Sequence, residues 1–327
     1  LEMNILIPMA GKGIRLQDNG FRMPKPLIEV KGVPMVQRVI ENTKLDANFI
    51  YVVRKEHVDH YSIDVVLRKI KEGEIFQLEE DNEGQTQTCL LAETVLNTDE
   101  ELLIINCDNY FIWDQEDFEK IRERGDVDGA AFTFKDEENR SHWCFAELDK
   151  EGNIKRLVEK DPISDVALAG AFYWKKSSDF LKYAKKTIDN NERASNGEFY
   201  LGGVFQQAID SGKKIASHQI KDMKCMGTPE ELDSFKKWLD LKDQKYTHSK
   251  NMSTNRKVQS ALDDLRNGKP IVLVDEYDRE NEGDIVVAGE KANVENIVFT
   301  MNKAKGLMCI PCEGSILDRL KLPAMVE

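Results

Sequence analysis

The sequence lacks the features of membrane, secreted and disulfide-stabilised proteins. Its longest apolar stretches, at 102–105 and 271–274, fall far short of the ~20 residues that span a bilayer. The first residues show no basic start, apolar middle and small-residue cleavage site, so no signal peptide is indicated. Six cysteines are dispersed through apolar segments, which favours reduced thiols. We therefore expect a cytoplasmic protein with no membrane span.

Positive charge is also scarce. The 327 residues carry 46 Lys and Arg against 59 Asp and Glu, a net charge of −13, and no basic run stands out. A protein that binds a phosphate backbone or an anionic lipid surface needs a cluster of Lys and Arg on its own surface, so we exclude nucleic acid and membrane as main partners. Small anionic substrates remain compatible, because a site for them needs only a few local cations.

The hydrophobic patterning divides the chain into two domains. Residues 3–240 alternate short β-rich runs with helical segments, which predicts a mostly parallel sheet covered on both faces. Within them, successive strand-like runs at 142–149, 153–160 and 166–175 predict an antiparallel insertion. Residues 241–255 are polar and have no apolar periodicity, so we expect a linker. Residues 256–327 resume strand and helix patterns and predict a partial α+β second domain.

One group of residues indicates a phosphate site. A buried-type strand at 4–8 opens into AGKGIRL, where Gly11 and Gly13 allow a tight turn whose N–H groups can face phosphate oxygens, and Arg15 adds charge. An ordinary strand-to-helix turn is the alternative for this motif alone. Lys25, held between two prolines, supplies a second fixed cation that can return to the same phosphates.

Two further segments extend this site. The predicted strand 102–110 places Asp108 at the carboxyl edge of the sheet, where a carboxylate can hold Mg²⁺ beside a triphosphate or, alternatively, cap a turn. Gly84 would let a flat base approach closely and Gln85 could hydrogen-bond it, although a glycine at a helix start has the same pattern.

These motifs together resemble the sugar-phosphate nucleotidyltransferase superfamily, in particular its capsule and surface-polysaccharide branch. The resemblance covers residues 3–240 and is carried by IPMAGKGIRL, MPKPLIEVKGVPM, NCDNYFIWD, SHWCFAELDKEGNI, LVEKDPIS, GAFYWKKSSDF, NGEFYLGGVF and MGTPEELDSF. It implies a GT-A-like, Rossmann-type fold that joins an NTP to a phosphorylated small-molecule acceptor, with Mg²⁺ and with release of pyrophosphate. CTP is the favoured nucleotide.

The resemblance also implies roles for individual residues. Arg15, Lys25 and Asp108 would be catalytic, with Asp108 on the metal; Ala10, Gly11, Gly13, Gly84 and Gln85 would bind the nucleotide; Glu159, Lys160 and Glu198 would bind the acceptor. Many relatives carry a second metal-binding Asp where this chain has Cys225, and a thiol is a poor Mg²⁺ ligand. We expect Asp222 or water to take that place.

A second group of residues lies in DRENEGD, between two apolar strand-like runs. Segment 252–327 resembles the N-terminal part of 3,4-dihydroxy-2-butanone 4-phosphate synthase of the riboflavin pathway. The resemblance implies site roles for Arg279, Glu280, Glu282, Asp284 and Cys309. No His follows His248, so this segment cannot complete that family's metal site from its own residues.

Three functional hypotheses follow from these two resemblances. The first is a nucleotidyltransferase with a truncated synthase-like appendage. The second is a synthase, if the native chain continues beyond Glu327, and the third is a nucleotide-binding regulatory protein without turnover. A partial synthase domain would expose strand edges and apolar surface, which predicts a homo-oligomer.

Overall fold

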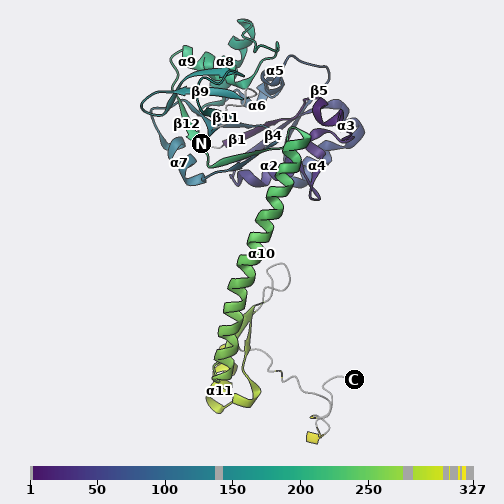
Figure 1. Cartoon of the computed structure of the whole chain (residues 1–327), viewed down its shortest axis with the longest axis vertical. Coiled ribbons are helices and arrows are strands. Elements are labelled where there is room, and N and C mark those ends of the chain that lie inside the picture. The colour runs from purple at the N-terminus through teal and green to yellow at the C-terminus, as the bar shows by residue number, and fades with distance from the viewer. Residues whose placement is uncertain are drawn as a thin grey trace. The chain divides into compact units, whose positions relative to one another are not determined.

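The computed structural model describes residues 3–136, 143–274, 283–304, 309, 316 and 319–321, with the backbone alone described over 243–257. The chain divides into two units, Leu1–Leu239 and Asp240–Glu327 (Figure 1). Among the described residues, no helix is long and apolar enough to cross a membrane.

Unit 1 is built on a nine-stranded mixed sheet in the order β5-β4-β1-β6-β11-β8-β12-β10-β9. In that order the strands are Gly73–Leu78, Asn48–Arg54, Met3–Pro8, Glu101–Ile105, Val166–Trp174, Gly129–Lys135, Ile215–Gln219, Asn153–Glu159 and Cys144–Leu148. The first four run parallel, as do β8 and β12, and the other pairings are antiparallel. The predicted α/β class is confirmed, and the predicted antiparallel strands are built into the same sheet.

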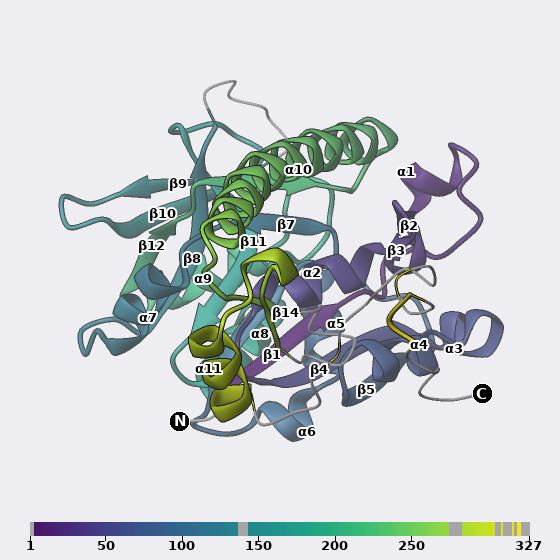
Figure 2. The same cartoon turned by 90° about the horizontal axis from the view of Figure 1, so that it is seen from below.

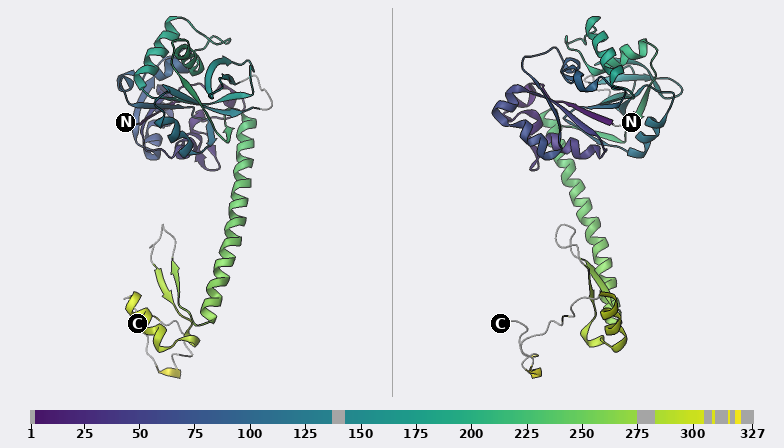
Figure 3. Two further views of the ribbon diagram at one scale, coloured as in Figure 1. Left: turned by 90° about the vertical axis from the view of Figure 1, so that its left-hand side faces the viewer. Right: turned by 180° about the vertical axis from the view of Figure 1, so that it is seen from behind.

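Helices cover both faces of this sheet, because strand β1 is apolar on both sides. Ile5 and Ile7 belong to one core and Leu6 to the other, and all three are fully buried. The first core packs against α2 (Met35–Thr43), α4 (Ile63–Ile70) and α7 (Gln115–Glu123) (Figure 2). The second packs against α5 (Gln85–Leu90), α6 (Glu93–Leu96), α8 (Ser177–Asp189) and α9 (Leu201–Asp210). Figure 3 shows these two helical layers on opposite sides of the sheet.

The remaining elements of unit 1 are short and lie mainly around the edge of the sheet. They are α1 (Ile14–Gln17), η1 (Lys25–Leu27), β2 (Glu29–Val30), β3 (Val33–Pro34), α3 (Lys55–Tyr61), β7 (Asn109–Ile112) and β13 (Asp222–Cys225). Strands β7 and β13 form a separate antiparallel pair. The single strand expected at 102–110 is therefore wrong, because β6 ends at Ile105 and β7 starts at Asn109. The Asn109 side chain fixes the break by donating to the carbonyl oxygen of Ala169 at 2.8 Å.

A buried histidine lies on β12. The ring of His218 lies 4.6 Å from that of Phe132 and 5.6 Å from that of Phe118, and its Nε2 has no hydrogen-bond partner. Burial lowers the pKa of His218 to about 4, although the carboxylates of Asp117 and Asp114 oppose the shift. The native state therefore holds this imidazole neutral at pH 7.

Helix α10 extends over Pro229–Arg266. It begins with a capping box, since Glu231 accepts hydrogen bonds from the N–H groups of Gly227 and Thr228 at 3.0 Å and its own N–H donates to Thr228 Oγ1. Its first turns bury Leu232 and Phe235 in unit 1. The backbone of the predicted linker 241–255 is helical and continues α10, because a polar segment without Gly or Pro does not break a helix.

Unit 2 also contains the hairpin of β14 (Ile271–Val274) and β15 (Gly283–Val286), followed by η2 (Gly289–Lys291) and α11 (Val294–Ala304). Exposed apolar side chains are frequent here, for example Val274 at 66% and Val294 at 81% exposure. Of the predicted α+β segment 256–327, the described residues thus comprise the end of α10, this hairpin, η2 and α11.

Candidate active site

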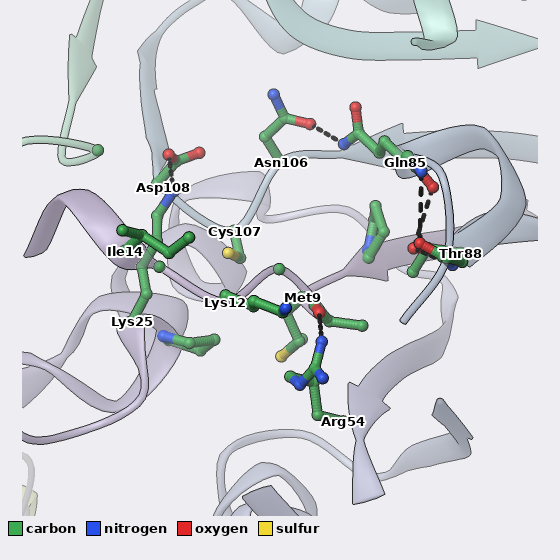
Figure 4. A pocket seen from close by; sticks show the side chains of 18 of the residues that line it. Met9, Lys12, Ile14, Lys25, Arg54, Gln85, Thr88, Asn106, Cys107 and Asp108 are labelled. Carbon is green, nitrogen blue, oxygen red and sulfur yellow. Dashed lines mark hydrogen bonds and ion pairs between the residues drawn. The ribbon is translucent and has the colours of Figure 1, made fainter. Parts of the chain in front are cut away.

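A pocket of about 720 Å³ lies at the carboxyl ends of the parallel strands (Figure 4). Its lining comes from the end of β1 and the loop after it, from the end of β4, and from the segments after β5 and β6. The residues are 8–15, Lys25, Pro26, Arg54, Asp81, Asn82, Gly84, Gln85, Thr88, 106–108, Glu198, Tyr200 and Gly227. In the sheet, β4 lies on one side of β1 and β6 lies on the other side. The connections that follow β1 and β6 therefore lead in opposite directions. Such a switch point is where open α/β sheets bind ligands.

The glycine loop after β1 forms one wall of this pocket. A Cβ at Gly11 would meet nothing within 4 Å, so this position is open. Gly13 has a φ of 68° and a Cβ there would lie 3.2 Å from Lys25 Cβ, so both its backbone conformation and its packing favour glycine. Ala10 and Arg15 also line the pocket. The structure thus brings the predicted phosphate loop and Lys25 together.

Lys25 and Asp108 form an ion pair inside the pocket. Burial opposes the charge on Lys25, but the Asp108 carboxylate, with smaller contributions from Cys107 and Cys225, outweighs it, and the net effect is to raise the pKa of Lys25. Gly227 lies against this pair, since a Cβ there would be 3.0 Å from Asp108 Oδ2 and 3.8 Å from Lys25 Nζ. The predicted cation and the predicted metal ligand therefore face each other directly.

Gly84 and Gln85 line the opposite part of the pocket. Gly84 has a φ of 137°, and a Cβ there would lie 2.6 Å from the carbonyl oxygen of Phe199. The close approach of that backbone accounts for the glycine, while contact with a base stays a prediction. The Gln85 side chain donates to Asn106 Oδ1, which joins this wall to the loop after β6.

The residues predicted for the acceptor side come from β10 and the segment before α9. Glu198 lines the pocket and accepts a hydrogen bond from the Tyr200 hydroxyl at 2.5 Å. Lys160 Nζ lies 5.4 Å from the centre of the Tyr200 ring. Glu159 is packed against Cys144, and its burial raises the pKa of the carboxyl. Of these three predicted residues, only Glu198 is part of the pocket lining itself.

The structure does not bring Asp222 to the pocket. Asp222 lies opposite Ile112 in the β7–β13 pair and forms an ion pair with Lys224, three positions from Cys225, which lies opposite Asn109. Asp108 is the predicted ligand that does line the pocket. Mg²⁺ prefers one or two carboxylates together with substrate phosphates, so Asp108 and a bound triphosphate fit this ion without a second side chain from β13.

Most residues predicted for the synthase-like segment fall outside the described residues, namely Arg279, Glu280 and Glu282. Asp284 is exposed on β15, opposite Leu273 of β14, and Cys309 is also exposed. Their roles stay predictions.

Three charged residues of the pocket were not singled out from the sequence. Asp81 accepts from Arg54 Nη2 at 2.7 Å and from Lys12 Nζ at 2.5 Å, and Arg54 Nη1 donates to the carbonyl oxygen of Ala10 at 3.1 Å. The hydrogen bonds from Lys12 and Arg54 lower the pKa of Asp81. Arg54 ends a parallel strand, so the edge rule that selected Asp108 would also have selected Arg54.

The fold matches solved nucleotide-processing proteins. The nucleoside-diphosphate-sugar pyrophosphorylase from Vibrio cholerae RC9 is 22% identical, with a TM-score of 0.60 over 71% of this chain and 99% of that chain. The inositol-1-phosphate CTP transferase from T. maritima is 16% identical, with a TM-score of 0.57 over 71% of this chain and 91% of that chain. At these identities the likeness shows the Rossmann-like fold.

Curated relatives match a shorter stretch. The 3,4-dihydroxy-2-butanone 4-phosphate synthase of Agrobacterium fabrum is 41% identical over 74 residues, which are 23% of this chain and 35% of that protein. The monofunctional riboflavin biosynthesis protein RIBA 2 of Arabidopsis thaliana is 30% identical over 131 residues, 38% of this chain and 27% of that protein. The chain thus spans about a third or less of the length of these relatives.

Family models confirm the two-segment resemblance. Residues 259–327 match 3,4-dihydroxy-2-butanone 4-phosphate synthase, and residues 5–253 match nucleotidyl transferase. Since the second match spans well over half of the sequence and contains the whole pocket, this chain belongs to the nucleotidyl transferase family of enzymes.

Proposed function

We propose that unit 1 is a Mg²⁺-dependent nucleotidyltransferase that joins an NTP to a sugar phosphate or another small-molecule phosphate and releases pyrophosphate. The observation that carries this proposal is the convergence of the glycine loop, Lys25 and Asp108 on one pocket at the carboxyl edge of the sheet. Open backbone at Gly11 and the ammonium of Lys25 suit a triphosphate, and the Asp108 carboxylate suits the cation that accompanies it.

Nucleotidyl transfer requires that the two substrates are positioned and that the charge on their phosphates is neutralised. An oxygen of the acceptor phosphate attacks the α-phosphorus of the NTP in line, a new P–O bond forms, and the bond to the β-phosphate breaks, so that its electron pair leaves with pyrophosphate. Bound Mg²⁺ would supply additional neutralisation of the phosphates. Lys25 and Arg15 neutralise the charge that develops on the phosphate oxygens, and no covalent protein nucleophile is needed.

The acceptor belongs on the side of Glu198 and Tyr200, which line the pocket beyond Gln85. Glu159 and Lys160 stand behind this wall, where Lys160 lies over the Tyr200 ring. Carboxylate and hydroxyl groups here suit a polyhydroxylated acceptor, and we propose CTP as nucleotide with a surface-polysaccharide precursor as product. Support for CTP comes from the branch of the superfamily that the motifs resemble.

The test is pyrophosphate release from each of the four NTPs with Mg²⁺ and a panel of sugar and non-sugar phosphates. One NTP and acceptor pair should give release, and Asp108→Asn should abolish it. Asp99→Asn is the matched control, because Asp99 is an exposed carboxylate paired with Lys176 outside the pocket. Nucleotide binding without release across the panel would instead support the regulatory hypothesis.

A further inference from the structure

Contacts of three charged side chains tie the glycine loop to the ends of two neighbouring strands. Arg54 donates through Nη1 to the Ala10 carbonyl oxygen at 3.1 Å and through Nη2 to Asp81 at 2.7 Å. Asp81 in turn binds Lys12 at 2.5 Å. Because Lys12 and Ala10 belong to the same loop, these contacts close into a ring.

Arg54 is the fixed member of this ring. Its side chain is 14% exposed, against 52% for Lys12 and 53% for Asp81. It is the last residue of β4, which is hydrogen-bonded to β1 on one side and β5 on the other. A planar guanidinium also presents its donors in a rigid fork, so two bonded groups define its orientation. The loop is thereby attached to the centre of the parallel part of the sheet.

The contact with Ala10 also orients the next peptide N–H. In a trans peptide the carbonyl oxygen of one residue and the N–H of the following residue point in opposite directions within one plane. With the Ala10 oxygen turned to Arg54, the N–H of Gly11 points away from Arg54. Met9 N–H donates to the Val52 carbonyl oxygen at 2.8 Å, so the residue before this peptide is fixed to β4 as well.

We propose that Arg54 is a positioning residue for nucleotide phosphates, which holds the Ala10–Gly11 peptide so that the Gly11 N–H meets a phosphate oxygen. Figure 4 shows Arg54 reaching the loop from the side opposite to Asp108. Nη1 and Nη2 of Arg54 are already bonded to the Ala10 oxygen and to Asp81, so Arg54 acts through the loop and not as a direct phosphate ligand. This inference rests on the proposed function.

The test measures nucleotide affinity apart from turnover. CTP, UTP, GTP and ATP are each titrated into the full-length protein with Mg²⁺ and without acceptor, using wild type, Arg54→Met and Arg54→Lys. Arg54→Met should raise the Kd of the bound nucleotide about tenfold or more, as expected when a charged hydrogen-bonding partner is lost. Arg54→Lys should rescue part of this loss, since an ammonium can reach one of the two oxygens. The KM of the acceptor should stay within about twofold, because this ring does not contact the acceptor side.

A matched control is Arg124→Met, because Arg124 binds Asp126 and Asn153 outside the pocket and its removal leaves the loop untouched. Equal Kd values for Arg54→Met and wild type would overturn the proposal. So would a loss of acceptor and nucleotide affinity in parallel with a loss of thermal stability, since that pattern means a purely structural role. A wild-type protein that binds none of the four nucleotides would refute the proposed function itself, and this inference with it.

Discussion

The stability of unit 1 should depend on pH through His218. In the native state this ring is 3% exposed, lies among aromatic side chains and has a pKa lowered to about 4. An unfolded histidine titrates near 6.5. Between these two values the unfolded chain binds a proton that the native state does not, so protonation favours unfolding. The native state should lose stability as the pH falls from 7 toward 4, with no contribution from this group above pH 7.

The size of the effect follows from the two pKa values. The two pKa values differ by about 2.5, and this difference lowers the free energy of unfolding by about 3 kcal/mol at pH 4 and by about 2 kcal/mol at pH 5. His218→Leu replaces the titrating imidazole with an apolar side chain of similar size. The free energy of unfolding of this variant relative to wild type should therefore rise by about 2 kcal/mol between pH 7.5 and pH 5.

Urea unfolding followed by tryptophan fluorescence measures this difference. All four tryptophans, Trp113, Trp143, Trp174 and Trp238, lie in unit 1, so the signal reports on that unit within the intact chain. Groups that do not interact with His218 titrate equally in both proteins and cancel in the comparison, so that only Asp114 and Asp117, which act on this ring, add to its own contribution. A difference between variant and wild type that stays constant over this pH range would refute a neutral, buried His218.

Three further predictions concern the pocket. Gly84→Ala should lower the free energy of unfolding by about 2–4 kcal/mol in the same urea assay, because the φ of Gly84 is positive and a Cβ there would overlap backbone atoms. Gly125→Ala is the control and should change the free energy of unfolding by less than about 0.5 kcal/mol, because the space around Gly125 is open. Equal effects of the two substitutions would contradict the packing at Gly84. Gly11→Ala should leave stability unchanged but raise the Kd of the NTP severalfold in calorimetric titrations, since the new methyl group enters the space beside the loop; unchanged affinity would place the phosphates elsewhere. Lys25→Met should strengthen Mn²⁺ binding to the nucleotide-free protein severalfold, because the substitution releases the Asp108 carboxylate from its ion pair. Electron paramagnetic resonance measures this Mn²⁺ affinity, and an unchanged value would argue against Asp108 as the metal ligand.

The sequence was sufficient to predict the α/β class and the edge of the sheet that carries the pocket. Both depend on local signals: apolar runs on both faces of strands, and polar residues where those runs end. Gly13, Lys25 and Asp108 could be selected in this way because each follows or interrupts an apolar segment. The break between β6 and β7 could not, since Asn106 and Asn109 are fixed by contacts with β11, which lies about 60 residues later in the chain.

The same limit explains the other differences. The place of Asp222 depends on its register with β7, which no local pattern specifies. Gly84 was interpreted as room for a ligand, which stays a prediction, and the second reason for this glycine, the backbone of Phe199, lies more than 100 residues away in sequence. The place of Arg54 at the end of β4 could have marked it as a candidate, but its contacts with Ala10 and Asp81 form only where the ends of β1, β4 and β5 lie side by side.

The charge arrangement of the pocket bears on how an acidic protein with a net charge of −13 takes up an anionic substrate. Lys25 faces Asp108, and both Arg54 and Lys12 face Asp81, so two carboxylates compensate most of the charge of these three cations. Such a site attracts a distant triphosphate only weakly, because opposite charges a few ångströms apart largely cancel at range. Affinity must then arise at contact, where phosphate oxygens replace Asp108 beside Lys25 and meet the oriented loop N–H groups. Recognition at this pocket therefore depends on how accurately the loop is held. For this reason an arginine that contacts the loop backbone should contribute to nucleotide affinity as much as the cations that face the phosphates.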